Sequence, residues 1–223
     1  MKILFEKIKI FCPHILLLLC AFFITSCSQN MPELSQSDYS VIFDYAEDEE
    51  YPSARLSVFM SAASDVRRFE RIRIKSLEAD YIWDTSEIAC LESDNVQWAG
   101  CTNLVAPENK KLPLGRYEVS YFNADEKECK VVLDITYDAD FYDVLFSALP
   151  EVMADKKGLE KIAIYGKDKL LLYFGDRNTE FKTTRGIWNV YREAETYNLI
   201  WYTRDGRVIC IGPEKKVTPE AEN

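Results

Sequence analysis

The chain of 223 residues carries 37 acidic and 27 basic side chains, which gives a formal net charge of −10. This acidic balance argues against nucleic acid as a partner, because phosphate binding needs clustered Lys and Arg. The only histidine, His14, lies within the first 26 residues. The rest of the chain therefore cannot build a Ser-His-Asp or Cys-His catalytic centre, or a His-ligated zinc or iron site.

The first 26 residues have the features of a secretory signal peptide. Three lysines against one glutamate give a positive start, and the ten residues from Ile15 to Ile24 are all apolar. This run is too short to cross a membrane as a helix, which needs about 20 residues. The small residues Thr25 and Ser26 follow, as expected just before a cleavage point.

The tetrad Ile24-Thr25-Ser26-Cys27 resembles the lipobox of bacterial lipoproteins, and this resemblance covers the first 27 residues only. It implies that residues 1–26 are removed and that Cys27 carries two or three acyl chains, palmitate among them. At ~0.8 kcal/mol per buried methylene group, several chains anchor a protein permanently, whereas one chain is marginal. The alternative is an ordinary secretory peptide with a chance cysteine.

The resemblance also indicates a location in the bacterial cell envelope. No Asp follows Cys27 directly, and in enteric bacteria that Asp would signal retention in the inner membrane. We therefore expect the outer membrane rather than the inner one. The mature chain would lose three Lys and one Glu, which leaves 24 basic and 36 acidic side chains and a net charge of −12.

Residues 27–38 are polar and predict a flexible tether, and residues 39–137 then alternate as strands do. In the segment RIRIK, Ile72 and Ile74 are expected to point inward while the basic residues between them point outward. The other inward sets are Tyr39, Val41, Phe43 and Tyr45; Leu56, Val58 and Met60; Tyr117, Val119 and Tyr121; and Cys129, Val131, Leu133, Ile135 and Tyr137. A turn is predicted over residues 123–127. Short strands joined by turns indicate an antiparallel β-sandwich or barrel.

Pro113, Gly115 and Tyr117 precede one of these strands, and the hairpin that they open resembles the closing hairpin of immunoglobulin-like and fibronectin-like domains. The resemblance is close over about 25 residues and loose over residues 39–137. It implies an immunoglobulin-like β-sandwich, although the Cys-Trp-Cys spacing of antibody domains is absent. This resemblance concerns the fold and does not indicate a function.

Residues 138–212 predict a small, β-rich α+β domain, with an extension of the sandwich as the alternative. A short amphipathic helix is expected to start after Asp140, as its N-cap, and to stop at Pro150. Strands are expected in LEKIAIYG, KLLLYFG and GIWNVYRE, followed by a hairpin turning at Gly206. The charged tail, 213–223, is expected to be disordered.

Four candidate features remain. Trp188, Trp201 and Tyr202 are a candidate interaction surface, because neighbouring residues of a strand face opposite ways and one of the last two must leave the core. Cys90 and Cys101 bracket a polar segment and are a candidate disulfide, with Cys129 and Cys210 reduced. Acidic clusters at 44–50 and at Asp134, Asp138, Asp140 and Asp143 do not have EF-hand spacing, so solvated loops are favoured over calcium sites.

Together these features predict a membrane-anchored envelope lipoprotein that acts as a non-catalytic binding or structural module for a protein or a glycan. We expect no cofactor and no metal apart from the covalent lipid, and contact with the membrane only through that lipid. The alternative function is a carbohydrate-active enzyme that works without histidine through a pair of Asp or Glu side chains. No residue pattern identifies such a pair.

Overall fold

The structure is a computed structural model that describes residues 33–62, 66–106 and 110–219. The predictions for the signal peptide, Cys27, the tether up to residue 32 and the tail from residue 220 lie outside the described residues. Residues 34–38 of the predicted tether instead belong to a strand, and so do Lys215–Lys216 of the tail that was predicted to be disordered. The described residues belong to one compact unit. They are mainly β, as the alternating pattern predicted, with two sheets and two short α-helices.

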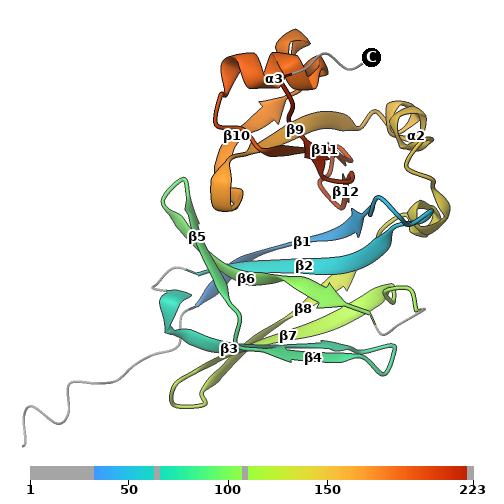
Figure 1. Cartoon of the computed structure of the whole chain (residues 1–223). Helices are drawn as coiled ribbons and strands as arrows, with labels where there is room; N and C mark the ends of the chain where they lie inside the picture. Colours follow the sequence, from blue (N-terminus) through green and yellow to red (C-terminus); the bar gives the residue numbers. More distant parts are fainter. Residues whose placement is uncertain (1–32, 63–65, 107–109, 220–223) are drawn as a thin grey trace, which may run out of the picture. The chain divides into compact units, whose positions relative to one another are not determined.

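The larger sheet is curled into a half-barrel (Figure 1) and follows the order β10-β9-β11-β12-β1-β2-β6-β5, with β13 paired to β11. Its neighbours are antiparallel except β1 and β12, which are parallel. The strands are β1 (Leu34–Asp44), β2 (Ser53–Ala62), β5 (Ala89–Ser93), β6 (Val96–Val105), β9 (Leu159–Tyr165), β10 (Leu171–Asp176), β11 (Thr196–Tyr202), β12 (Val208–Ile211) and β13 (Lys215–Lys216).

The smaller sheet is antiparallel throughout, in the order β4-β3-β7-β8. Its strands are β4 (Ile82–Thr85), β3 (Phe69–Ser76), β7 (Gly115–Asn123) and β8 (Glu128–Ile135). The predicted inward residues Ile72, Ile74, Tyr117, Val119 and Tyr121 are all buried. The predicted alternation of strands β1, β2, β3 and β7 is therefore confirmed, because a period of two places every second side chain on the core face.

The segment around Pro150 differs from its prediction. A 3-10 helix, η2 (Ala139–Asp143), is capped by Asp138 rather than by Asp140, since the Asp138 side chain accepts a hydrogen bond from Asp140 N. The α-helix α2 (Leu149–Asp155) then begins one residue before the proline, which lies in its first turn instead of ending a helix. Proline is tolerated in the first turn of a helix, where its missing N–H would have no helical partner.

The segment GIWNVYRE was predicted to be a strand, and this prediction is wrong. It contributes to the α-helix α3 (Thr184–Val190), which is preceded by the 3-10 helix η4 (Thr179–Lys182). The Thr183 side chain accepts a hydrogen bond from Gly186 N and so caps the helix at its start. Its Ile187 joins a buried cluster with Ile162 and Ile164 of β9, so tertiary packing overrides the β propensity of this sequence.

Two further 3-10 turns complete the described elements, η1 (Val66–Arg68) and η3 (Lys167–Lys169). Sequence reasoning missed the hairpin of β5 and β6, because this stretch was interpreted as a polar turn between two cysteines. Asp94 and Asn95 form its two-residue loop and both have positive φ, 52° and 62°. That conformation matches the turn type that two-residue hairpins favour.

The larger sheet continues across residue 138, where a boundary between two domains was expected. Val41 of β1 pairs with Val208 of β12, so strands from both segments form one hydrogen-bonded sheet. The Phe43 ring also packs against Phe141 and Tyr142, with ring centroids 5.7 Å and 5.1 Å away. The two segments therefore share part of their core.

Candidate functional site

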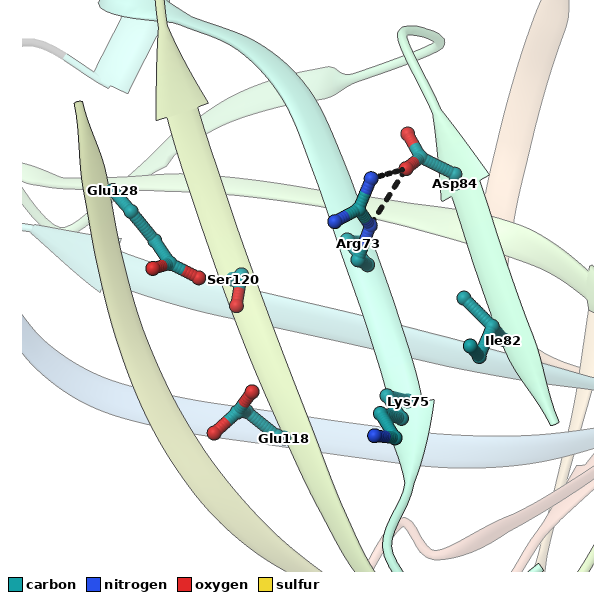
Figure 2. A pocket seen from close by; sticks show the side chains of 7 residues that line it. All are labelled: Arg73, Lys75, Ile82, Asp84, Glu118, Ser120 and Glu128. Carbon is teal, nitrogen blue, oxygen red and sulfur yellow. Dashed lines mark hydrogen bonds and ion pairs between the residues drawn. The ribbon is translucent and has the colours of Figure 1, made fainter. Parts of the chain in front are cut away.

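A groove of about 410 Å³ lies on the solvent-exposed face of the smaller sheet (Figure 2). It crosses all four strands, and its volume falls in the range of ordinary ligand pockets. Its lining residues are Arg73 and Lys75 of β3, Ile82 and Asp84 of β4, Glu118 and Ser120 of β7, and Glu128 of β8.

Strand register explains why these side chains meet. One row across the sheet contains Asp84, Arg73, Ser120 and Lys130, each opposite the next. The neighbouring row contains Ile82, Lys75, Glu118 and Val132. Side chains directly opposite in an antiparallel sheet project from the same face, so both rows lie on the outer face of the smaller sheet, where Ser120 is covered by its longer neighbours. The small side chain of Ser120, surrounded by long ones, leaves the hollow between the rows.

Ion pairs hold one wall of the groove in place. Arg73 donates from Nε and Nη2 to the same oxygen of Asp84, at 2.7 Å and 2.6 Å. Arg71 reaches Asp84 at 3.3 Å and Glu126 at 2.5 Å. Its guanidinium carbon lies 3.9 Å from the centroid of the Phe122 ring, which is buried beneath it. Each exposed pair contributes little alone, but the shared carboxylate makes a network that orients Arg73.

Two charges that line the groove have no ion-pair partner among the described residues, Lys75 and Glu128. The groove has two other carboxylates. Asp84 pairs with Arg73, and Glu118 forms an ion pair with the Lys130 ammonium at 3.3 Å. Lys75 and Glu128 come from strands on either side of β7, with Ser120 between them (Figure 2). Counted over the part of the chain that the structure describes, the groove thus offers one unpaired cation and one unpaired anion to a ligand.

The positions of the carboxylates in the groove can be compared with those that the alternative function, a carbohydrate-active enzyme, would need. Glycoside hydrolysis needs two carboxylates about 5–9.5 Å apart on either side of the bond that is cut. Glu128 lies opposite Phe122 and Glu118 lies opposite Val132, so their backbones are separated by four residues along the strands, roughly 13 Å. Lys130 stands between them and pairs with Glu118. The register and the pairing of Glu118 with Lys130 give no support to a facing carboxylate pair, and the carbohydrate-active enzyme stays the alternative prediction.

The predicted aromatic surface is not brought together. Trp201 is buried and packs its ring against Phe146 at 5.8 Å, whereas Tyr202, the next residue of β11, points to the opposite face and is half-buried. Trp188 is half-buried on α3 and is covered by the guanidinium of Arg192 at 3.6 Å. The prediction that one of Trp201 and Tyr202 leaves the core agrees with these positions, but the three rings do not form one platform.

All four cysteines of the described residues are free thiols. Cys90 lies opposite Ala99, so Cys101 is a diagonal neighbour on the adjacent strand rather than a direct partner. Diagonal neighbours in a sheet are roughly 7–8 Å apart, at or beyond the limit for a disulfide, so a bond here would need a local shift. The pairing of Cys90 with Cys101 therefore stays a prediction for the oxidised protein.

Three residues of the two acidic clusters form ion pairs with basic side chains. Asp44 binds Arg55, Asp138 binds Lys156 and Asp143 binds Lys111. Within the described part of the chain, no three Cys, Asp or Glu side chains come together as a metal site would require. In the same residues, the helices are all too short or too polar to span a bilayer.

Sequence reasoning identified part of this groove. The alternation in RIRIK placed Arg73 and Lys75 on the outer face of the sheet, and the inward set of β7 implies that Glu118 and Ser120 face outward. The pattern does not state which strands are neighbours, and β4 had not been recognised as a strand. A scan for outward charges on adjacent strands, given the pairing order, would have found the groove. No family model matches the chain, and a search of curated proteins finds no match either.

Proposed function

We propose that this protein is a lipoprotein of the bacterial envelope, anchored by an acylated Cys27, whose sandwich binds a charged polypeptide segment through the groove on the smaller sheet. The protein is non-catalytic, and the outer membrane is its expected location. The observation that carries the proposal is the pair of free charges, Lys75 and Glu128, on the two sides of Ser120.

The strand order supports an immunoglobulin-like sandwich within residues 33–137. Read along the chain, strands 1, 2, 6 and 5 share one sheet and strands 4, 3, 7 and 8 share the other. Immunoglobulin-like domains divide their strands in the same way, with ABED in one sheet and the C and F–G strands in the other. The hydroxyl of Tyr117 also donates to the carbonyl of Pro113, four residues upstream, at 2.6 Å. Such a tyrosine corner is a feature of these domains.

The chemistry of the groove favours a polypeptide over a glycan. Sugar rings usually stack on exposed aromatic faces, but the one aromatic ring on this part of the sheet, Phe122, is buried under Arg71. A segment with an acidic and a basic side chain would pair with Lys75 and Glu128 and gain charge-assisted hydrogen bonds. Opposite charges on the groove also fix the direction in which such a segment binds.

The proposal is tested by photo-crosslinking in cells that produce the lipidated protein. A photoreactive amino acid at Ile82, a residue of the groove that is 57% exposed, is expected to trap a protein adduct, whereas the same group at the exposed Arg204, on the β11–β12 turn, is expected to trap none. The substitutions Lys75→Glu and Glu128→Lys, each alone, are expected to abolish the adduct. Arg204→Glu changes charge by the same amount as Lys75→Glu and is expected to leave it unchanged.

If Lys75→Glu and Glu128→Lys each form as much adduct as the parent protein, the role of Lys75 and Glu128 is contradicted. An adduct whose added mass is removed by a glycosidase would replace the polypeptide by a glycan. Mass spectrometry of the N-terminal peptide tests the anchor separately, because an unmodified Cys27 would end the argument for lipid anchoring without touching the groove.

A further inference from the structure

One edge of the larger sheet is unprotected. The sheets end in four edge strands, β10 and β5 in the larger sheet and β4 and β8 in the smaller one. β8 exposes alternating charges at Glu128, Lys130 and Asp134, and β4 is only four residues long. Charges and short length are the usual ways in which proteins prevent an edge from pairing with another strand. β10 is longer than β4 and carries its only charge at its last residue, Asp176, since its first five residues are LLYFG.

The apolar side chains of β10 are also exposed. Leu171 and Phe174 are 53% and 54% exposed, and Leu170 just before them is 65% exposed. A β-bulge at Leu172 sets their direction. Leu171 lies opposite Tyr165 and Phe174 lies opposite Ala163, so the extra residue brings both onto the face that carries Ala163 and Tyr165. Without the bulge, two residues three apart would point to opposite faces.

That face is the one that α3 does not cover. The opposite face of β9 carries Ile162 and Ile164, which pack with Ile187 of α3. Tyr173 of β10 joins the same cluster and is therefore half-buried. Strand β10 is thus anchored by one side, while the other side presents Leu171 and Phe174 beside a row of unpaired backbone N–H and C=O groups.

We propose that β10 pairs in antiparallel fashion with β10 of a second copy of this chain. Two copies related by a two-fold axis would join their larger sheets edge to edge, as expected for an isologous interface. Leu171 of each chain would approach Phe174 of the other, and such aliphatic–aromatic pairs across strands stabilise sheets.

The charges at the ends of the strand select this partner and this direction. Lys169 precedes β10 and Asp176 ends it, so an antiparallel copy brings the cation of one chain toward the anion of the other at both ends. A parallel arrangement would place like charges together. Lys169 and Asp176 already have partners within the chain, Glu214 and Lys161, so the interface would extend these pairs into two networks.

The test is the self-association of the mature chain carrying Cys27→Ser, which lacks the acylation site. Sedimentation velocity over a wide concentration range is expected to show a monomer–dimer equilibrium. Leu171→Lys and Phe174→Lys are each expected to raise the dissociation constant at least about tenfold, because each sets a charged side chain against an apolar side chain of the other copy. Val132→Lys, at a residue of the edge strand β8 that is 52% exposed, is the matched control and is expected to leave dimerisation unchanged.

Hydrogen exchange locates the interface independently. The outward amides of β10 are expected to become protected as the concentration rises, whereas those of β5 are not. Far-UV circular dichroism and urea midpoints confirm that the lysine variants are folded, which exposed positions should permit. A chain that remains monomeric at every concentration would overturn the proposal, as would a dimer that Val132→Lys weakens more than Leu171→Lys or Phe174→Lys does.

Discussion

Three tyrosine hydroxyls hold the segment Leu112–Pro113 between the two sheets. Tyr117 donates to the carbonyl of Pro113 and Tyr137 donates to the carbonyl of Leu112, both at 2.6 Å. Tyr142 accepts the N–H of Leu112 at 2.8 Å. Burial raises the pKa of Tyr117 to about 12, so its hydroxyl remains a donor at neutral pH. A loop without ladder hydrogen bonds is thereby satisfied by side chains instead.

Removing one of these hydroxyls is expected to destabilise the fold. Tyr117→Phe keeps the buried ring but leaves the carbonyl of Pro113 without its donor, which should cost about 1–2 kcal/mol of unfolding free energy. Urea denaturation measures this cost. Tyr51→Phe is the control, because Tyr51 is 48% exposed and its hydroxyl has no hydrogen bond among the described residues. Equal stability of the two variants would show that the corner is not a stabilising contact.

The four thiols are expected to react at very different rates. Burial raises the pKa of Cys101 and Cys129 to about 11 and that of Cys210 to about 12. At pH 8 a thiol with a pKa of about 11 is ionised in roughly one molecule in a thousand, and the thiolate is the reactive form. Cys90 is exposed on the edge strand β5 and should be alkylated first.

Peptide mapping after brief treatment with iodoacetamide measures this order. Labelling of Cys101 as fast as Cys90 would contradict the burial. Failure of Cys90 to react until a reductant is added would instead favour the predicted disulfide with Cys101. The urea-unfolded protein is the control, since all four thiols should then react alike.

Among the elements, η2 and α2 are joined by an ion pair that makes stability depend on pH. The hydrogen bond from Lys156 holds the pKa of Asp138 below its ordinary value of 3.8. A lowered pKa in the folded state means that the contribution is fully present above pH 3.8 and is lost as the pH falls below it. The stabilisation needs the ionised carboxylate, which also caps η2.

Asp138→Asn is therefore expected to lower the unfolding free energy at pH 7, and the difference from the parent chain should shrink as the pH falls below 3.8. Thermal or urea unfolding over this pH range checks the trend. Asp155→Asn, an exposed residue of α2 without an ion-pair partner among the described residues, should show no such difference. If the difference in unfolding free energy between Asp138→Asn and the parent chain stays constant down to low pH, the effect belongs to the cap geometry rather than to the charge.

Elements were predictable where local pattern and tertiary burial agree. The inward sets of β1, β2, β3 and β7 follow from a period of two, because those strands bury one whole face. The helix α3 was not predictable in this way: its residues have β propensity, and only the Thr183 cap and the packing of Ile187 decide the outcome. Pro150 can either start or end a helix, and the sequence alone does not distinguish the two. The groove needed the order of the strands, which no local pattern contains.

At the scale of the whole molecule, the parallel pairing of β1 with β12 decides how the protein unfolds. This contact joins residues from opposite ends of the chain, so it could not be predicted from local pattern. It places β1 in the interior of the larger sheet instead of at its edge. Phe43 of β1 is fully buried and its ring packs against Phe141 and Tyr142 of the η2 segment, which ties both halves to one core.

Such a shared core predicts one cooperative unfolding unit for the described residues. Ile72→Val, a buried position in β3 that does not touch residues 138–219 in the register, should cost about 0.5–1.5 kcal/mol. Native-state hydrogen exchange is then expected to show the same loss of protection in the slowest amides of β7 and of β9, because both are exposed only by global unfolding. Ile162→Val in β9 is the reciprocal control and should lower protection in β7 equally. If each substitution affects only its own half, the halves unfold separately and the boundary expected near residue 138 separates two domains in solution despite the continuous sheet.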